Sequence, residues 1–288
     1  MTVRLSMKGS LLAVALAFGW ALPVGGPSAA AAQEFGQCGA ALEAFTPDPA
    51  FTSEFFLDEC PDTRNRFGSA RSRRCPSRFT TVGTNPYFPL RPGWQLVLAS
   101  DEAVLKVSVL DEVEWVDGVR TRVVEEREWE IDEEGGLGLV EVSRNFFVHD
   151  RLTGAVYYLG EDSVDGEGTP LAGSWRSGEG AQGGLIMPGT ILLGGRYYQE
   201  IAPADEALDK GEILTLEPSC EVGEFTFEHC VTVADTSDCD PDELSIKVYA
   251  RGVGIVVDDD AEVRCFGRDG ACDPFLCETY GEGCPDQD

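Results

Sequence analysis

Residues 119–148 read VRTRVVEEREWEIDEEGGLGLVEVSRNFFV, and their pattern decides the fold. Two runs of alternating residues flank the turn sequence Glu134-Gly135-Gly136. One face of the first run carries Arg122, Val124, Glu126, Glu128, Glu130 and Asp132. One face of the second run carries Val140, Val142, Phe146 and Val148, interrupted only by Arg144. Period-two alternation with a charged outside indicates half-buried antiparallel strands.

The same pattern continues on both sides of this stretch, with turn signals at Asp117-Gly118 and Thr153-Gly154. Further strands are expected at residues 95–100, 104–110, 155–159, 197–201, 212–216, 225–234, 245–250 and 254–257. No segment sustains a helical apolar repeat, and a brief helical turn near residues 204–208 is the only helix expected. The prediction is an all-β fold, an antiparallel meander that forms a curved sheet or an open barrel. Glycine-rich residues 162–193 are expected to form a long irregular excursion.

The first 32 residues have the pattern of a secretory signal. Arg4 and Lys8 precede an apolar run at residues 11–24, and Ala30-Ala31-Ala32 supplies small residues for cleavage before Gln33. The run is shorter than the roughly 20 residues that span a bilayer, so no transmembrane segment is expected. No cysteine stands at the cleavage point, and the sequence therefore predicts a secreted or periplasmic protein without a lipid anchor.

The chain is strongly acidic, with 51 acidic and 22 basic residues and a formal net charge of −29. Its hydrophobic fraction of 43% is too high for a disordered acidic chain. Nucleic acid and anionic membrane surfaces would repel this charge, so neither is expected as a partner. The sequence leaves the oligomeric state open.

Ten cysteines in three groups indicate disulfides in an exported protein. The groups are Cys38, Cys60 and Cys75; Cys220, Cys230 and Cys239; and Cys265, Cys272, Cys277 and Cys284. The last group has neither a CxxC spacing nor a histidine, so disulfides suit it better than zinc. If these four pair among themselves, the groups of three cannot each be self-sufficient. At least one bridge then joins the N-terminal arm to the late body.

These features divide the chain into four parts. They are a signal peptide (1–32), a Cys- and Arg-containing N-terminal arm (33–83), an all-β body (84–257) and an acidic Cys-rich tail (258–288). We expect the arm and the tail to be held by disulfides. No cysteine lies between residues 76 and 219, so packing must hold the middle of the body together.

A string of motifs runs through the body. It consists of NPYFPL at 85–90, GED at 160–162, GSW at 173–175, IMP at 186–188, YYQE at 197–200 and YARGVG at 249–254. In this order the string resembles a widespread family of secreted bacterial proteins that open on an NPYFPL-type motif. The resemblance covers about residues 84–257. It implies no activity, because none is assigned to that family.

The leading functional hypothesis is an exported, non-enzymatic β domain that binds a small or apolar ligand. A half-open barrel leaves an apolar face that a ligand can cover, either on the concave side or under the glycine-rich excursion. Trp175, Met187 and Tyr198 are the candidate ligand-binding residues. The ligand class is inferred from the fold alone.

A carbohydrate-active hydrolase is the first alternative. Glycoside hydrolysis needs two carboxyl groups on either side of the sugar bond, and Glu161, Asp162 and Glu200 lie near Trp175 and Tyr198. The competing interpretation is a solvated acidic surface. The chain contains no GxSxG motif, so the sequence does not indicate a serine hydrolase.

A calcium-stabilised surface or structural protein is the second alternative. Asp238, Asp240 and Asp242 place oxygen ligands at alternate positions, which suits a hard cation outside the cell. Glu243 stands where the EF-hand loop has its glycine, so the segment is not that loop. The simpler interpretation is that these acids keep an exported protein in solution. Calcium is the one cofactor that the sequence suggests.

Overall fold

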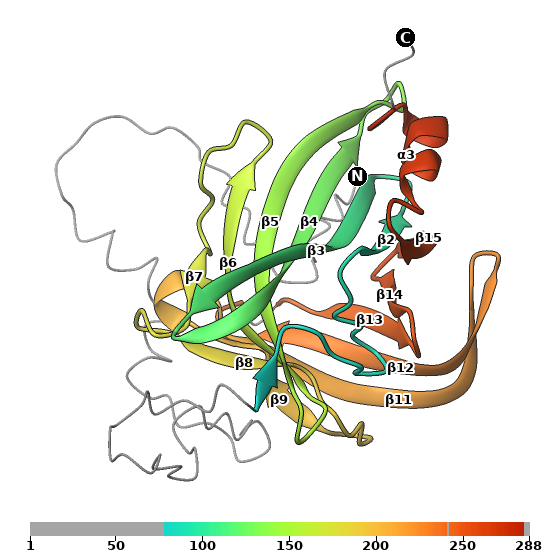
Figure 1. Ribbon diagram of the computed structural model, residues 1–288. Coiled ribbons are helices and arrows are strands. Elements are labelled where there is room, and N and C mark those ends of the chain that lie inside the picture. The colour runs from blue at the N-terminus through green and yellow to red at the C-terminus, as the bar shows by residue number, and fades with distance from the viewer. Residues whose placement is uncertain (1–77, 241, 285–288) are drawn as a thin grey trace, which may run out of the picture.

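The computed structural model describes residues 78–240 and 242–284, which form one antiparallel, nearly closed β-barrel (Figure 1). The first strands are β1 (Phe79–Thr80), β2 (Trp94–Ala99), β3 (Ala103–Val116), β4 (Val119–Ile131), β5 (Leu137–Asp150), β6 (Val156–Asp165), β7 (Trp175–Arg176) and β8 (Gln182–Met187). The later strands are β9 (Arg196–Tyr198), β10 (Glu200–Ile201), β11 (Asp209–Val222), β12 (Phe225–Ser237), β13 (Ser245–Ala250), β14 (Gly254–Asp258) and β15 (Ala261–Arg268).

The barrel closes on a single short segment of chain. Its strand order is β10-β8-β6-β5-β4-β3-β2-β15-β14-β13-β12-β11-β9, with β1 paired to β5 and β7 paired to β6. Only Gln199 separates β9 from β10, so the two ends of this order are consecutive in the chain. Gly184 is required at this seam, because a Cβ there would lie 2.1 Å from the carbonyl oxygen of Gln199.

The all-β prediction is confirmed. A curved sheet or an open barrel was expected, and the structure is a nearly closed barrel. The stretch that decided the prediction forms the paired strands β4 and β5, with Glu128 opposite Glu141. Both strands extend as far as their alternation indicated.

Two predictions about individual elements are wrong. Residues 162–193 are not irregular throughout, because β6 continues to Asp165 and β8 pairs with it. A helix, α3 (Asp273–Tyr280), follows the barrel, whereas only a turn near 204–208 was expected. That turn is the 3-10 helix η2 (Pro203–Asp205). An eight-residue helix is too short to show a repeat, and its tertiary contacts stabilise it.

The charged face of β4 is not outside. Glu126 is buried in the barrel, on the same face as the core residue Val124. The opposite face of β4 is buried too, since Val123 and Trp129 pack in clusters on the outer side. Alternation shows that the two faces of a strand differ, but it does not show which face turns inward.

Residues 84–93, here called the crossing segment, cover one end of the barrel. The side chain of Asn85 donates to the carbonyl oxygens of Gly154 and Pro188 at 2.9 and 3.0 Å. The carbonyl oxygen of Pro86 accepts from the N–H of Gly252 in the β13–β14 turn at 2.6 Å. The segment therefore joins turns on opposite sides of the strand order.

Apolar packing anchors the crossing segment. The ring of Phe88 packs edge-on against Phe147, with ring centroids 4.9 Å apart, and Leu90 is fully buried in the main core. The indole of Trp94, at the start of β2, donates to the carbonyl oxygen of Val253 at 3.0 Å. The NPYFPL motif thus has a structural role, because it covers and anchors one end of the barrel.

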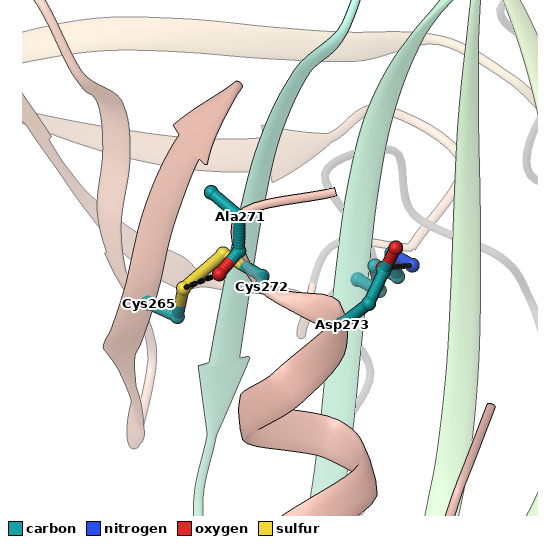
Figure 2. The surroundings of a disulfide bond; sticks show 5 residues. Cys265, Ala271, Cys272 and Asp273 are labelled. Carbon is teal, nitrogen blue, oxygen red and sulfur yellow. Dashed lines mark hydrogen bonds and ion pairs between the residues drawn. A yellow bond between two sulfur atoms is a disulfide. The ribbon is translucent and has the colours of Figure 1, made fainter. Parts of the chain in front are cut away.

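The C-terminal tail packs on the outer side of the barrel (Figures 1 and 2). Cys272 and Leu276 join a cluster with Val97, Val104 and Trp129 from β2, β3 and β4. A disulfide joins Cys265 of β15 to Cys272, and Lys106 forms an ion pair with Asp273 at 2.7 Å (Figure 2).

The described disulfides confirm that the last four cysteines pair among themselves. The bridges are Cys220–Cys230, Cys265–Cys272 and Cys277–Cys284. Cys239 is also disulfide-bonded, and none of these six cysteines is its partner. Cys38, Cys60 and Cys75 lie outside the described residues, as do the signal peptide and residues 33–77 of the arm. The bridge between arm and body therefore stays a prediction.

Candidate functional site

The barrel interior consists of an apolar and a polar layer. Along β5, the inward residues Glu141 and Asn145 come first, and Phe147 precedes the turn that the crossing segment contacts. β14 begins at the crossing segment with Ile255 and ends at Asp258. Both strands therefore place their polar side chains at the end far from the crossing segment.

Seven buried carboxyl groups from seven strands form this polar layer, here called the acidic layer. They are Glu126 of β4, Glu141 of β5, Glu161 of β6, Glu200 of β10, Asp209 of β11, Asp235 of β12 and Asp258 of β14. Lys247 of β13 is the only buried lysine among the described residues. The layer thus contains many more carboxyl groups than amines.

Glu161 and Glu200 lie together beside two aromatic side chains. They are 2% and 1% exposed, and the charge of Glu161 contributes to the raised pKa of Glu200. The indole N–H of Trp175 donates to Oε2 of Glu200, and the Tyr158 hydroxyl hydrogen-bonds with Glu161. Tyr158 and Trp175 meet edge to face, with ring centroids 5.1 Å apart.

Local backbone geometry puts Glu161 on the inner face. The register between β5 and β6 shifts between Asn145 and Phe147, so Tyr158 and Glu161 can both point inward. Gly160 lies at this bulge with φ +140°, and a Cβ there would be 2.4 Å from the carbonyl oxygen of Trp175. Glycine is therefore required beside Glu161.

Lys247 neutralises the opposite side of the layer. Its Nζ lies 3.0 Å from Oδ2 of Asp235, whose other oxygen accepts from the side chain of Gln199 at 2.9 Å. Asp258 accepts from the hydroxyl of Ser245 at 3.4 Å and also acts electrostatically on Lys247.

Burial raises the pKa values of five carboxyl groups of the acidic layer, those of Glu141, Glu161, Glu200, Asp209 and Asp258. Burial first, and then neighbouring carboxyl groups, raise the pKa values of Glu161 and Glu200 well above their ordinary range. Burial likewise raises the pKa of Asp209 to about 6 and that of Asp258 to about 7. Burial alone would lower the pKa of Lys247, but Asp258 and Asp235 raise it well above its ordinary value.

Several polar atoms of the layer are buried without a hydrogen-bond partner among residues 78–240 and 242–284. They include Nδ2 of Asn145 and Oε2 of Glu161. Asn145 is fully buried, its Oδ1 accepts from the Tyr158 hydroxyl at 3.0 Å, and it lies opposite Glu161 in the β5–β6 pairing. An unsatisfied buried polar atom costs about 1–3 kcal/mol, so such atoms mark candidate contact points for a ligand.

The predicted site residues separate into two groups. Glu161 and Glu200 come together with Trp175 inside the barrel, and Met187 lies in the same core cluster as Trp175. Asp162 lies outside this group, because it forms an ion pair with Arg176. Tyr198 also lies apart, since its hydroxyl donates to Asp238 at 2.8 Å.

The predicted calcium ligands have protein partners. Asp238 accepts hydrogen bonds from Tyr198 and Lys210, and Oδ1 of Asp240 accepts from the N–H of Asp242 at 3.2 Å. Within the described part of the chain, no group of three or more His, Cys, Asp or Glu side chains is arranged to hold a metal ion. Residue 241 of this loop lies outside that part, and calcium binding stays a prediction.

Sequence reasoning missed Asn145, Tyr158, Asp209, Asp235 and Lys247. A signal existed for Lys247, which interrupts the apolar strand Ser245–Ala250. Asp235 likewise follows the apolar run of β12. Their association depends on pairing between strands far apart in the sequence, which a single sequence does not reveal.

Comparison of the chain with protein-family models, curated proteins and solved structures finds no match in any of the three. No helix among the described residues is long and apolar enough to cross a membrane.

Proposed function

We propose that this chain is an exported binding protein that holds a small ligand inside its barrel, at the acidic layer. The observation that carries the proposal is the pair of buried atoms Asn145 Nδ2 and Glu161 Oε2, which have no hydrogen-bond partner among the described residues, with Glu161 opposite Trp175 in the β6–β7 pairing. A polar ligand would satisfy these atoms and contact the aromatic rings, as is typical of small-molecule sites. A purely apolar ligand would leave them unsatisfied, so a small polar ligand is favoured over an apolar one.

Export is part of the same proposal. The sequence pattern of residues 1–32 supports it, and the described disulfides are typical of oxidising compartments. The resemblance of the motif string to secreted bacterial proteins agrees with it.

A hydrolase acting through Glu161 and Glu200 is the second candidate, because these two carboxyls do lie together beside Trp175. Glycoside hydrolysis requires one carboxyl to be protonated while the other is ionised. Here burial raises the pKa values of both carboxyls, so neither is favoured as the ionised partner. Binding therefore fits the geometry better than hydrolysis.

Native mass spectrometry of the exported full chain tests the proposal. The expected spectrum shows a polypeptide beginning at Gln33 with a small molecule bound, and the added mass disappears on denaturation. A chain that carries no added mass, and whose melting temperature no member of a small-molecule panel raises, would contradict ligand binding. A chain that retains residues 1–32 would contradict export.

A further inference from the structure

The acidic layer is unevenly supplied with positive charge. On the side of β12, β13 and β14, Lys247 faces Asp235 and Asp258. On the side of β6 and β10, the largest influences on the pKa values of Glu161 and Glu200 after burial are other carboxyls, Tyr158 and Trp175, and the one buried lysine of the described residues, Lys247, pairs with Asp235 instead. One side of the layer holds an ammonium group, and the other side contains comparable carboxyl groups without one.

We propose, on the basis of the proposed function, that the ligand carries a protonated amine and that Glu161 and Glu200 bind this amine beside Trp175. The side chain of Lys247 shows that the layer accommodates such a group, with an N–O distance of 3.0 Å to Asp235. An ammonium group has three donors, and Oε2 of Glu161 is a buried acceptor that no described residue uses.

Aromatic side chains support a cation at this position. Trp175 and Tyr158 border the two carboxyls, and Phe147 stacks on Tyr158 with ring centroids 4.9 Å apart. Aromatic faces attract ammonium groups, and more strongly where water is excluded. Asn145 supplies the independent observation, because its fully buried and unpartnered Nδ2 gives the same place a donor for an oxygen of the ligand.

Binding is accompanied by proton release. Burial raises the pKa values of Glu161 and Glu200 well above their ordinary range, so a bound ammonium, which stabilises a carboxylate, displaces a proton. The O–H bond of a carboxyl breaks, its electron pair stays on the oxygen and the proton passes to the buffer. The titratable groups facing this pair are Tyr158, Glu126, Glu141 and Asp209, with Asp235 and Lys247 beyond Asp209. Because binding of the amine displaces a proton from Glu161 or Glu200, we expect the affinity for the amine to rise with pH.

Isothermal titration of the full exported chain with benzylamine and with its uncharged analogue benzyl alcohol tests the inference. We expect benzylamine to bind at least about tenfold more tightly than benzyl alcohol, the difference that one modest charged contact supplies. We also expect the heat of benzylamine binding to differ between phosphate and Tris buffers at pH 7, because a proton is released. Equal affinity for the two probes, no benzylamine binding, or a heat independent of the buffer would each overturn the inference.

Variants locate the site. Glu161→Gln combined with Glu200→Gln should weaken benzylamine binding at least about tenfold. Glu217→Gln is the matched control, because it removes one exposed carboxyl from β11 and should leave binding unchanged. Unchanged binding in the double variant would contradict the placement. The wild-type comparison of the two probes gives an answer even if the double variant does not fold.

The inference and the proposed function fail separately. If native mass spectrometry finds a retained molecule without an amine, the binding function stands and the amine assignment is wrong. If no molecule is retained, no member of the small-molecule panel raises the melting temperature and neither probe binds, both are wrong.

Discussion

The carboxyl of Glu161 shows how a residue suited to binding can reduce the stability of the fold. Its pKa is raised in the folded protein. Its contribution to the free energy of unfolding is therefore complete at low pH and declines as the pH rises toward the folded pKa. Glu161→Gln keeps the shape and removes this titration. We expect the variant to be more stable than wild type at pH 8, on the order of 1 kcal/mol, and to show no gain at pH 4. Urea unfolding at both pH values measures this, and an equal effect at the two values would contradict it.

Lys247 has the opposite effect on stability, because it neutralises buried carboxylates. Lys247→Met leaves Asp235 and Asp258 without their cation, and we expect a loss of about 3–5 kcal/mol at pH 7. The loss should be smaller at pH 4, where Asp258 is protonated, and Asp235→Asn should restore part of it. Lys210→Met is the control, because Lys210 pairs with the partly exposed Asp238 and should cost less than about 1 kcal/mol. Equal losses in the two lysine variants would show that the buried pair has no special role.

The crossing segment is the element that the sequence specified through a motif rather than through periodicity. Asn85 donates to two carbonyl oxygens, and its own oxygen accepts from the N–H groups of Tyr87 and Phe88. Asn85 is buried and its partner groups are partly buried, so Asn85→Ala leaves several of them unsatisfied, and we expect a loss of about 2–4 kcal/mol in urea unfolding.

The matched control for Asn85 is Asp132, which accepts from the N–H groups of Glu134 and Gly136 in an exposed turn. Water can replace those bonds, so Asp132→Ala should cost less than about 1 kcal/mol. If both alanine variants lose the same stability, closure by the crossing segment is not important for the barrel.

At the scale of elements, the sequence predicted strands better than it predicted their surroundings. Alternation located β4 and β5, because their two faces differ in composition at every second residue. It failed on which face is inside, since Glu126 is buried by partners from distant strands. Trp175, Glu161 and Glu200 were each singled out, but whether they meet depends on the pairing of β6 with β7 and β8. Local sequence does not encode that pairing.

For the whole molecule, the acidic layer predicts an unusual dependence of stability on pH. Burial raises the pKa of Asp258 and of Glu128 to about 7 and that of Asp209 to about 6, from ordinary values near 4. The contribution of these groups to the free energy of unfolding is complete below pH 4 and is lost as the pH rises to 7. Asp150 acts oppositely, because hydrogen bonds from Arg78 lower its pKa, and its contribution disappears as the pH falls. The free energy of unfolding should therefore be greatest near pH 4–5.

Repulsion between surface carboxylates would produce a similar trend in a chain of net charge −29, and salt separates the two causes. Surface repulsion is largely screened at high ionic strength, whereas buried groups are screened much less. We expect the loss of stability between pH 5 and pH 8 to persist in concentrated sodium chloride. If salt abolishes it, the surface charge and not the acidic layer is responsible.

The central claim is that the barrel contains a layer of buried carboxyl groups, in which Glu161 and Glu200 have raised pKa values and serve as a ligand site. Carbon-detected NMR titration of the Glu161 and Glu200 side-chain carboxyls, with and without benzylamine, tests it most directly. The account predicts that both carboxyls titrate well above the ordinary range of glutamate in the free protein and that benzylamine lowers their pKa values. Carboxyls that titrate in the ordinary range and do not respond to benzylamine would contradict it.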